Sequence, residues 1–418
     1  MKRICVILAV CFSTFASVFA QNVTLEDCQK MARDNYPQIR QLDLINASEK
    51  FDLSIASASW IPQFSVSGKA TWQSETVEMP FEIPGFDFNI PHDQYSLNAN
   101  VTQHLWDGGV SMSKKAAVKT GAQVQRQQLE VSLYSIRSRV QNIYLGILLI
   151  DEQIRQNSLL LESLKRNERN VKALMDNGMA YSSDADMVRV NMLNCCQQID
   201  ALDADRKTYV KMLGLLTGQD MEGAEFSMPS DQKRIDVNRI ARPELELYSA
   251  QLLQNEARIK QLNAAVNPQF DLTLQGGIGR PGLNMLKSDF SPIFIAGVRM
   301  QWNISGFYTR RNDKRKIEND KHNIELQQEL FEFNTQLDVS QKETEVDKAR
   351  KMLEKDDEIV ALRTSIRESG EEQYKNGIIR MTDLMDMIDQ EHNARIARSI
   401  HHIQLLMAVY DMKNTLGQ

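Results

Sequence analysis

The chain has 418 residues, 42% hydrophobic and 25% charged, with 19 glycines and 10 prolines, which excludes a collagen, a low-complexity coil and a disordered chain. The mean hydropathy of -0.40 excludes a polytopic helical membrane protein. The net charge of -6 argues against nucleic acid as a partner. Any membrane span in this chain must therefore be built from something other than helices.

Residues 1–20 have the features of a cleavable signal peptide. Lys2 and Arg3 precede an apolar stretch, and Val18-Phe19-Ala20 is a small-x-small cleavage site. A lipoprotein box at Leu8-Ala9-Val10-Cys11 is the alternative, which the valine before the cysteine disfavours. On either interpretation we expect the protein to be exported.

Three cysteines remain after the signal peptide, namely Cys28, Cys195 and Cys196. An odd number with two neighbours is not the pattern of a disulfide framework. We expect these residues to be small, partly buried side chains on helices. A redox role is the less favoured alternative, and the sequence assigns these cysteines no other function.

The exported part of the chain contains one unit twice. The first repeat is residues 21–218, the second is residues 242–418, and residues 219–241 link them as an equatorial segment. In each repeat a helix-like interval ends at Pro-Gln-Phe, a tryptophan-containing turn opens a long polar helix, and Asn-Gly ends that helix. The paired landmarks are Pro62-Gln63-Phe64 and Pro268-Gln269-Phe270, Trp106-Asp107-Gly108-Gly109 and Trp302-Asn303-Ile304-Ser305-Gly306, and Asn177-Gly178 and Asn376-Gly377.

Each repeat contains two segments in which apolar and polar residues alternate strictly. This pattern predicts strands with one apolar face at about 64–72, 95–105, 270–278 and 292–302. Lengths of roughly 9–11 residues suit a tilted strand that crosses a bilayer. A half-buried sheet in a soluble protein fits the same alternation. Residues 73–94 and 279–292 are expected to join the strands as surface loops.

The long helices, expected over Ser111–Asp176 and Thr309–Lys375, carry a heptad seam. At about 1.5 Å per residue, each would extend over roughly 100 Å. The seam is regular in the first helix and patchier in the second. Its members are Leu129, Leu133, Ile136, Val140, Ile143, Ile147, Ile150 and Ile154, then Leu326, Leu330, Phe333 and Leu337. Shorter helices are expected over Pro37–Ile61 and Pro243–Val266.

Four strands per chain cannot close a barrel, and hydrocarbon does not tolerate open sheet edges. If the strands span a membrane, several chains must each contribute them. The outer faces of the long helices are charged, so these helices must project from one side of the membrane as a coiled-coil tube.

With these features the chain resembles the TolC-like outer-membrane efflux proteins over essentially all of its exported part. The resemblance rests on the duplicated order of elements and on the turn Leu105-Trp106-Asp107-Gly108-Gly109 before an Ala/Gln-rich helix. It rests also on Asn-Gly at both helical hairpins and on Thr382-Asp383-Leu384-Met385-Asp386 beyond the second. The second turn, Asn303-Ile304-Ser305-Gly306, departs from the pattern of the first.

The resemblance implies an α+β membrane protein built from duplicated helix–β-hairpin–helix units. It implies a homotrimer with one shared barrel of ~12 strands and a long α-helical coiled-coil barrel in the periplasm. The implied function is a passive exit duct for efflux or secretion in the outer membrane of a Gram-negative cell. The implied partners are outer-membrane lipid, a periplasmic adaptor protein and an inner-membrane transporter of the RND or ABC type.

The resemblance also assigns candidate site residues. Asp383 and Asp386 would form the periplasmic gate, and the tips at Asn177, Gly178, Asn376 and Gly377 would dock the adaptor. The plainer interpretation of both tips is a glycine helix stop followed by N-caps at Ser182 or Ser183 and at Thr382. In a soluble monomer, Asp383, Asp386 and Asp389 would simply be a solvated helix face.

Three charged residues on the polar side of the strands, Lys69, Asp271 and Arg299, would line the lumen of a barrel. The sequence indicates neither an enzyme nor a cofactor: it contains no zinc-binding His-Glu-x-x-His, no phosphate-binding glycine loop and no nucleophile elbow. His392, His401 and His402 lie too far apart around one helix to favour a metal site. The alternative to a duct is a soluble periplasmic or surface coiled-coil protein with a structural or adhesive role. The sequence does not identify the transported substrate.

Overall fold

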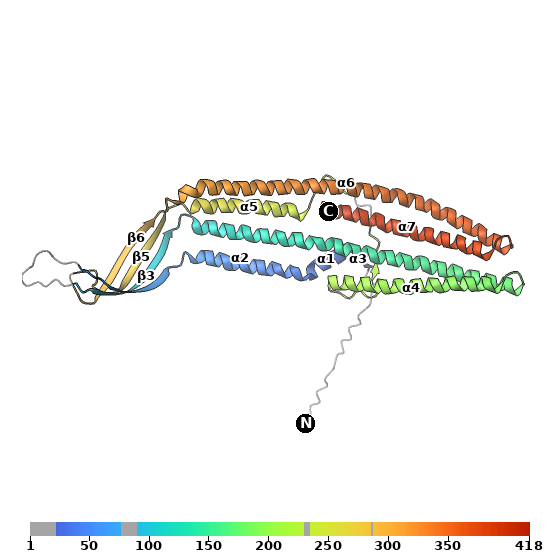
Figure 1. The fold of residues 1–418 in the computed structure, drawn as a ribbon, viewed down its shortest axis with the longest axis horizontal. Helices are drawn as coiled ribbons and strands as arrows, with labels where there is room; N and C mark the ends of the chain where they lie inside the picture. Colours follow the sequence, from blue (N-terminus) through green and yellow to red (C-terminus); the bar gives the residue numbers. More distant parts are fainter. Residues whose placement is uncertain (1–21, 77–89, 230–234, 286) are drawn as a thin grey trace, which may run out of the picture. The chain divides into compact units, whose positions relative to one another are not determined.

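The computed structural model describes residues 22–76, 90–229, 235–285 and 287–418. The expected signal peptide and most of the loop expected at 73–94 lie outside the described residues. In chain order the elements are β1 (Asn22–Val23), α1 (Leu25–Asn35), η1 (Pro37–Arg40), α2 (Gln41–Ala58), β2 (Gln63–Trp72), β3 (Asp93–Trp106), α3 (Val110–Asp176), α4 (Ser182–Thr217), β4 (Glu225–Phe226), α5 (Pro243–Ala264), β5 (Gln269–Arg280), β6 (Ser291–Gln301), α6 (Gly306–Lys375) and α7 (Met381–Leu416) (Figure 1).

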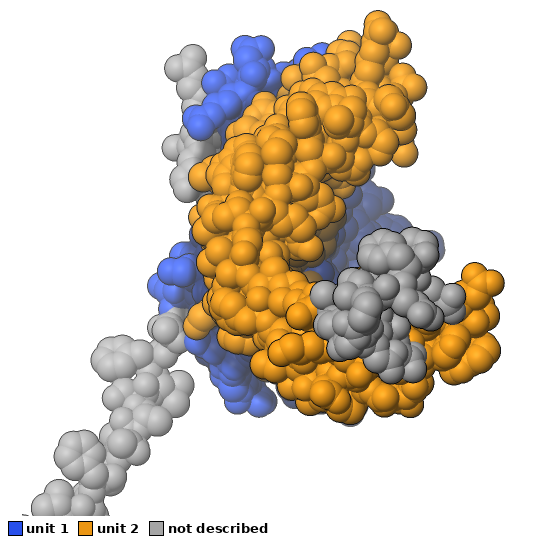
Figure 2. Space-filling model, turned by 90° about the vertical axis from the view of Figure 1, so that its left-hand side faces the viewer, with its two compact units in different colours: residues 1–39, 133–241, 335–418 blue, residues 40–132, 242–334 orange. Residues whose placement is uncertain are grey.

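The order of one helix, two strands and two helices occurs twice, as α2-β2-β3-α3-α4 and as α5-β5-β6-α6-α7. The chain folds into two compact units, coloured separately in Figure 2. Unit 1 comprises residues 1–39, 133–241 and 335–418, and unit 2 comprises residues 40–132 and 242–334. Each unit therefore takes segments from both halves of the sequence. No helix in the described part of the chain is long and apolar enough to span a membrane.

Unit 2 contains a four-stranded antiparallel sheet in the order β2-β3-β5-β6. Each strand overlaps one of the segments in which the sequence alternates. The hairpins β2-β3 and β5-β6 are joined by pairing of β3 with β5, in which Val101 lies opposite Leu274. Consequently the two hairpins form one continuous sheet, with β2 and β6 at its edges.

The register places apolar side chains of all the strands on one face of the sheet. In this register Val66 lies opposite Ala99, and Leu274 lies opposite Ala296. Several of these side chains are exposed in the single chain, including Phe64 at 78% and Phe294 at 71%. A contiguous exposed apolar face of this kind marks contact with a partner or with lipid.

The turn from β3 into α3 explains the Asp-Gly-Gly motif of the first repeat. The carboxylate of Asp107 accepts hydrogen bonds from the backbone N–H groups of Gly109 (2.9 Å) and Ser111 (2.7 Å), and so caps α3. Gly108 has φ +67°, and a Cβ there would lie 2.8 Å from Cβ of Asn267. The side-chain amide of Asn267 also donates to the Gly108 carbonyl at 2.8 Å. A residue without a side chain is therefore required at this turn.

Unit 1 is built around the heptad seam of α3. The seam is buried from Leu133 through Ile150, with Val140 and Ile147 fully buried. Tyr144 lies beside this seam, and burial raises the pKa of its hydroxyl to about 12. The hydroxyl lies 2.7 Å from the carbonyl oxygens of Val23 and Ser227, which share its single O–H donor. It thus holds the parallel pair β1-β4 against α3.

Cys28, Cys195 and Cys196 are free. Cys28 and Cys195 are buried and Cys196 is exposed, and burial raises the pKa of the Cys28 thiol to about 12. The Cys195 thiol donates to the Asn157 carbonyl at 3.1 Å, which connects α4 with α3. The buried thiols are thus protonated packing groups at neutral pH.

Replacing Tyr144 tests the connection between the β1-β4 pair and α3. We expect Tyr144→Phe to lower the free energy of unfolding by about 1–3 kcal/mol, because the buried Val23 carbonyl and the part-buried Ser227 carbonyl lose the hydroxyl donor that they share. The measurement is thermal unfolding followed by circular dichroism in detergent. Tyr209→Phe is the matched control, since Tyr209 is half-exposed and no hydrogen bond of its hydroxyl is found among the described residues. Equal losses in both variants would contradict this role of Tyr144.

Candidate functional site

The first helical hairpin, between α3 and α4, turns at Gly178. Gly178 has φ +73°. Its N–H bonds the Met175 carbonyl at 2.9 Å, and the N–H of Met179 bonds the Leu174 carbonyl at 2.8 Å. These two bonds form a Schellman cap, which needs a left-handed residue and therefore favours glycine. The side chain of Asn177 donates to the Ala173 carbonyl at 2.7 Å and closes the last turn of α3.

The second hairpin, between α6 and α7, repeats this geometry. Gly377 has φ +69°, and its N–H bonds the Tyr374 carbonyl at 2.9 Å. The N–H of Ile378 bonds the Gln373 carbonyl at 2.9 Å, and the side chain of Asn376 donates to the helix at 2.8 Å. The Asn-Gly pairs of the sequence are thus the structural stops of α3 and α6.

The helices after the turns are capped by aspartates, and the expected caps at Ser182, Ser183 and Thr382 are wrong. Asp184 accepts the backbone N–H of Tyr181, and Asp383 accepts that of Arg380, each at 3.1 Å. These carboxylates stand at the third helical position and supply the return half of a capping box. The Tyr181 and Arg380 backbones are extended, as N-cap residues require.

Two candidate gate residues, Asp383 and Asp386, are exposed on one side of α7. The pKa of Asp389, one turn further along, is raised by desolvation and by repulsion from Asp386. The opposite side of α7 is apolar and buried through Leu384 and Ile388. The structure therefore brings acidic side chains together along one face, with only Asp383 already engaged in capping.

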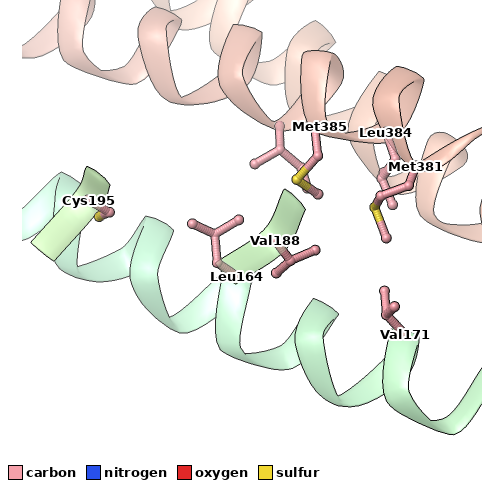
Figure 3. Packing of buried hydrophobic residues seen from close by; sticks show 8 residues of the cluster. Leu164, Val171, Val188, Cys195, Met381, Leu384 and Met385 are labelled. Carbon is pink, nitrogen blue, oxygen red and sulfur yellow. The ribbon is translucent and has the colours of Figure 1, made fainter. Parts of the chain in front are cut away.

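An apolar cluster joins the two hairpins within unit 1 (Figure 3). It takes residues from α3, α4 and α7, whose side chains point toward one another. The buried members are Leu164, Val171, Val188, Cys195, Met381, Leu384, Met385 and Ile388. Because this cluster fills the space behind the tips, the tip residues themselves face outward. Met179, Tyr181 and Ile378 are exposed apolar side chains there.

A buried ionic network connects α6 and α7 below the second tip, and the sequence pattern did not reveal it. Glu391 accepts from Arg367 Nε at 2.5 Å, from Arg395 Nη2 at 2.7 Å and from Thr364 Oγ1 at 2.7 Å. Burial alone would raise the pKa of Glu391, but these donors and the two guanidinium charges lower it. Glu391 is therefore ionised at neutral pH. The Glu391–Arg395 pair is local, four residues apart on α7, whereas Arg367 belongs to α6. The pairing of the two helices is therefore needed to complete the network.

On the polar face of the sheet, the structure brings Asp271 and Arg299 together but places Lys69 elsewhere. Asp271 is buried, with His104 Nδ1 at 2.5 Å from Oδ1 and Arg299 Nη2 at 3.3 Å from Oδ2. The three residues form one row across β3, β5 and β6. Lys69 lies on β2 opposite Ser96, in a different row, and is exposed. His104 completes this cluster, and it was not among the residues singled out from the sequence. Its place among the polar positions of β3 was the only sequence feature that could have indicated it.

The histidines of α7 do not assemble a metal centre. His401 Nδ1 lies 2.5 Å from Asp356 of α6, and burial lowers the pKa of His392. Over the described ranges, no three His, Cys, Asp or Glu residues are grouped so that they could hold a metal ion.

Changing the turn glycines tests the backbone requirement at both tips. A Cβ at Gly178 or Gly377 would meet no atom within 4 Å, so only the left-handed backbone opposes a side chain. We expect Gly178→Ala and Gly377→Ala each to cost about 1 kcal/mol of stability. Asparagine tolerates this conformation, so Gly→Asn at the same positions should cost less. Thermal unfolding of the four variants checks this, and equal losses for Asn and Ala would refute it.

This chain is similar to known proteins in sequence over part of its length and in fold over nearly all of it. Residues 29–219 match the sequence profile of a family described as "Outer membrane efflux protein". No curated protein matches the chain by sequence.

Several solved outer-membrane channels share the fold. The CmeC channel of Campylobacter jejuni is 16% identical with a TM-score of 0.63, and the match covers 94% of this chain and 85% of CmeC. VceC of Vibrio cholerae is 12% identical with a TM-score of 0.65, covering 94% of this chain and 96% of VceC. The open MtrE channel of Neisseria gonorrhoeae is 14% identical with a TM-score of 0.63, covering 94% and 88% respectively. The likeness in fold thus extends over nearly the whole chain.

Proposed function

We propose that this chain, which resembles the TolC-like outer-membrane efflux proteins in sequence over residues 29–219 and in fold over nearly its whole length, is a passive exit duct. It lies in the outer membrane, its helical part extends into the periplasm, and it releases solutes to the exterior. The observation that carries this function is the family match together with a sheet whose exposed apolar face fits a lipid surface.

Within this function, three copies close one barrel of ~12 strands, with the β2 edge of one copy pairing with the β6 edge of the next. The sheet order supports this closure, because it leaves one edge strand from each repeat. Exposed aromatic residues at strand ends, including Trp72 and Trp302, suit the headgroup region of a bilayer.

The long helices of the copies form a coiled-coil tube in the periplasm. The apolar seam of α6 supports packing between copies, because Leu326, Leu330 and Phe333 recur at heptad spacing and are exposed in the single chain. The seam of α3, in contrast, is already buried within its own chain from Leu129 through Ile150. One seam therefore stabilises the subunit and the other is free to join subunits.

The duct works with a periplasmic adaptor and an inner-membrane transporter, of the RND or ABC type, that supplies the energy. It carries out no catalysis. The adaptor docks at the hairpin tips around Asn177, Gly178, Asn376 and Gly377. The exposed side chains of Met179, Tyr181 and Ile378 support this, since they offer apolar anchors beside the turns.

Asp383 and Asp386 form the periplasmic gate. In a threefold tube they would become rings of carboxylates that attract cations. Their exposure on one side of α7 supports this, as does the apolar cluster that fixes the other side. Lys69, Asp271 and Arg299 belong to the face of the sheet that lines the lumen of the barrel, with Asp271 buried beneath its partners.

The gate is tested by conductance in planar bilayers with hexamminecobalt(III) added at the helical end. We expect Asp383→Asn with Asp386→Asn to raise the half-blocking concentration at least about tenfold, because two rings of charge are removed. Asparagine at position 383 keeps an oxygen that can cap α7.

Asp184→Asn is the matched control, because Asp184 caps α4 in the same way as Asp383 caps α7. The control variant should be blocked like the unaltered protein. Unchanged block in the double variant would remove these residues as the gate, and an unaltered protein without conductance would refute the duct itself.

A further inference from the structure

On the polar face of the sheet, positively charged residues outnumber negatively charged ones. In the four strands these residues are Lys69, Asp271 and Arg299, two cations and one anion. Asp93 and Arg280 belong to the opposite register, where they lie opposite Trp72 and Tyr95. The polar face therefore carries a net positive charge, although the chain as a whole is acidic at -6.

The single anion of this face is not available to a solute. Asp271 is buried, and His104 and Arg299 occupy one carboxylate oxygen each. The Arg299 side chain remains 55% exposed although one of its nitrogens contacts Asp271. A solute at this face would meet guanidinium and ammonium groups and no free carboxylate from these strands.

Strand β6 departs from the strict alternation expected for residues 292–302, because its polar register also contains apolar residues. Its polar register contains Ile293 and Ile295, which lie opposite Gly277 and Gln275. Ile295 is 44% exposed although it stands on the polar face. Gly297, between Ile295 and Arg299 in the same register, has only open space where a Cβ would be. Apolar side chains, an open patch and a cation thus follow one another along β6.

We propose that this face of β6, with Lys69 of β2, is a selectivity surface for amphipathic organic anions. Arg299 stands at one end of this face, and Lys69 lies in the row of Ser291 at the other end. Either cation attracts the anionic group of the solute, while Ile293 and Ile295, whose rows lie between them, contact its apolar body. This inference rests on the proposed function, because the face must line the barrel through which the solute passes. It adds a substrate class to that function.

The physical basis is the combination of a charge with an apolar surface in a confined pore. An arginine in a restricted lumen attracts anions more strongly than one in bulk water, because the effective dielectric constant is lower. Contact with isoleucine adds a hydrophobic contribution that a simple inorganic anion cannot gain. Inorganic anions should therefore be favoured weakly, and anions with an aromatic or aliphatic body more strongly.

The test is block of single-channel current in planar bilayers by 1-naphthalenesulfonate, added at the strand end, compared with N-methylquinolinium, a cation of similar size. For the unaltered protein we expect the anion to block at a concentration on the order of tenfold lower than the cation. Lys69→Gln and Arg299→Gln should each raise the half-blocking concentration of the anion several-fold, and Ile295→Ser should do so without changing chloride selectivity.

Arg280→Gln is the matched control, since it removes one positive charge from the same sheet on the opposite register. Lys69→Gln keeps the test decisive if Arg299→Gln does not fold, because Lys69 is exposed and lies outside the Asp271 cluster. Conductance with equal block by both probes, or with block unaffected by Lys69→Gln and Ile295→Ser, would overturn the selectivity surface and leave the duct intact. Absence of any conductance would overturn both.

Discussion

The fold depends on a sheet whose edge strands and apolar face are left without partners in a single chain. Four antiparallel strands present one apolar face, and their order leaves β2 and β6 as edges. Unpaired edge groups are costly in hydrocarbon, and an exposed apolar face is unfavourable in water. The proposed duct satisfies both requirements together, with lipid around the face and further copies along the edges. The remaining features, from the exposed seam of α6 to the polar face of β6, acquire a role once the sheet is closed in this way.

Local backbone and capping hydrogen bonds set the ends of the long helices, and the positions of these ends determine where the candidate functional groups lie. Gly178 and Gly377 stop α3 and α6 with the same pair of backbone bonds, and Asp184 and Asp383 start the next helices with the same reciprocal bond. Because the apolar cluster behind the tips is shared by both hairpins, the two tips are held as one structure within unit 1. Exposed apolar and acidic side chains are then free for partners and ions.

Much of this architecture could be predicted from the sequence because its signals are local and occur twice. Alternation predicted strands near those observed, and the heptad seam around Val140 and Ile147 proved to be buried. The capping residues were missed because serine and threonine are the usual N-caps, whereas here Asp383 bonds the backbone from inside its helix. His104 was missed because its partner Asp271 is distant in sequence, and only strand pairing brings the two together. Glu391 was missed because Arg367 and Thr364 stand on a different helix, although Arg395 is only four residues away.

The most direct test of the account is the native mass of the exported protein, extracted from outer membranes in mild detergent and measured by light scattering with the detergent contribution subtracted. Closure of the sheet by neighbouring copies predicts a particle of three chains that precipitates when detergent is removed. A monomer or dimer that stays dispersed without detergent would contradict the account, because its strand edges and apolar face would then need neither lipid nor further copies.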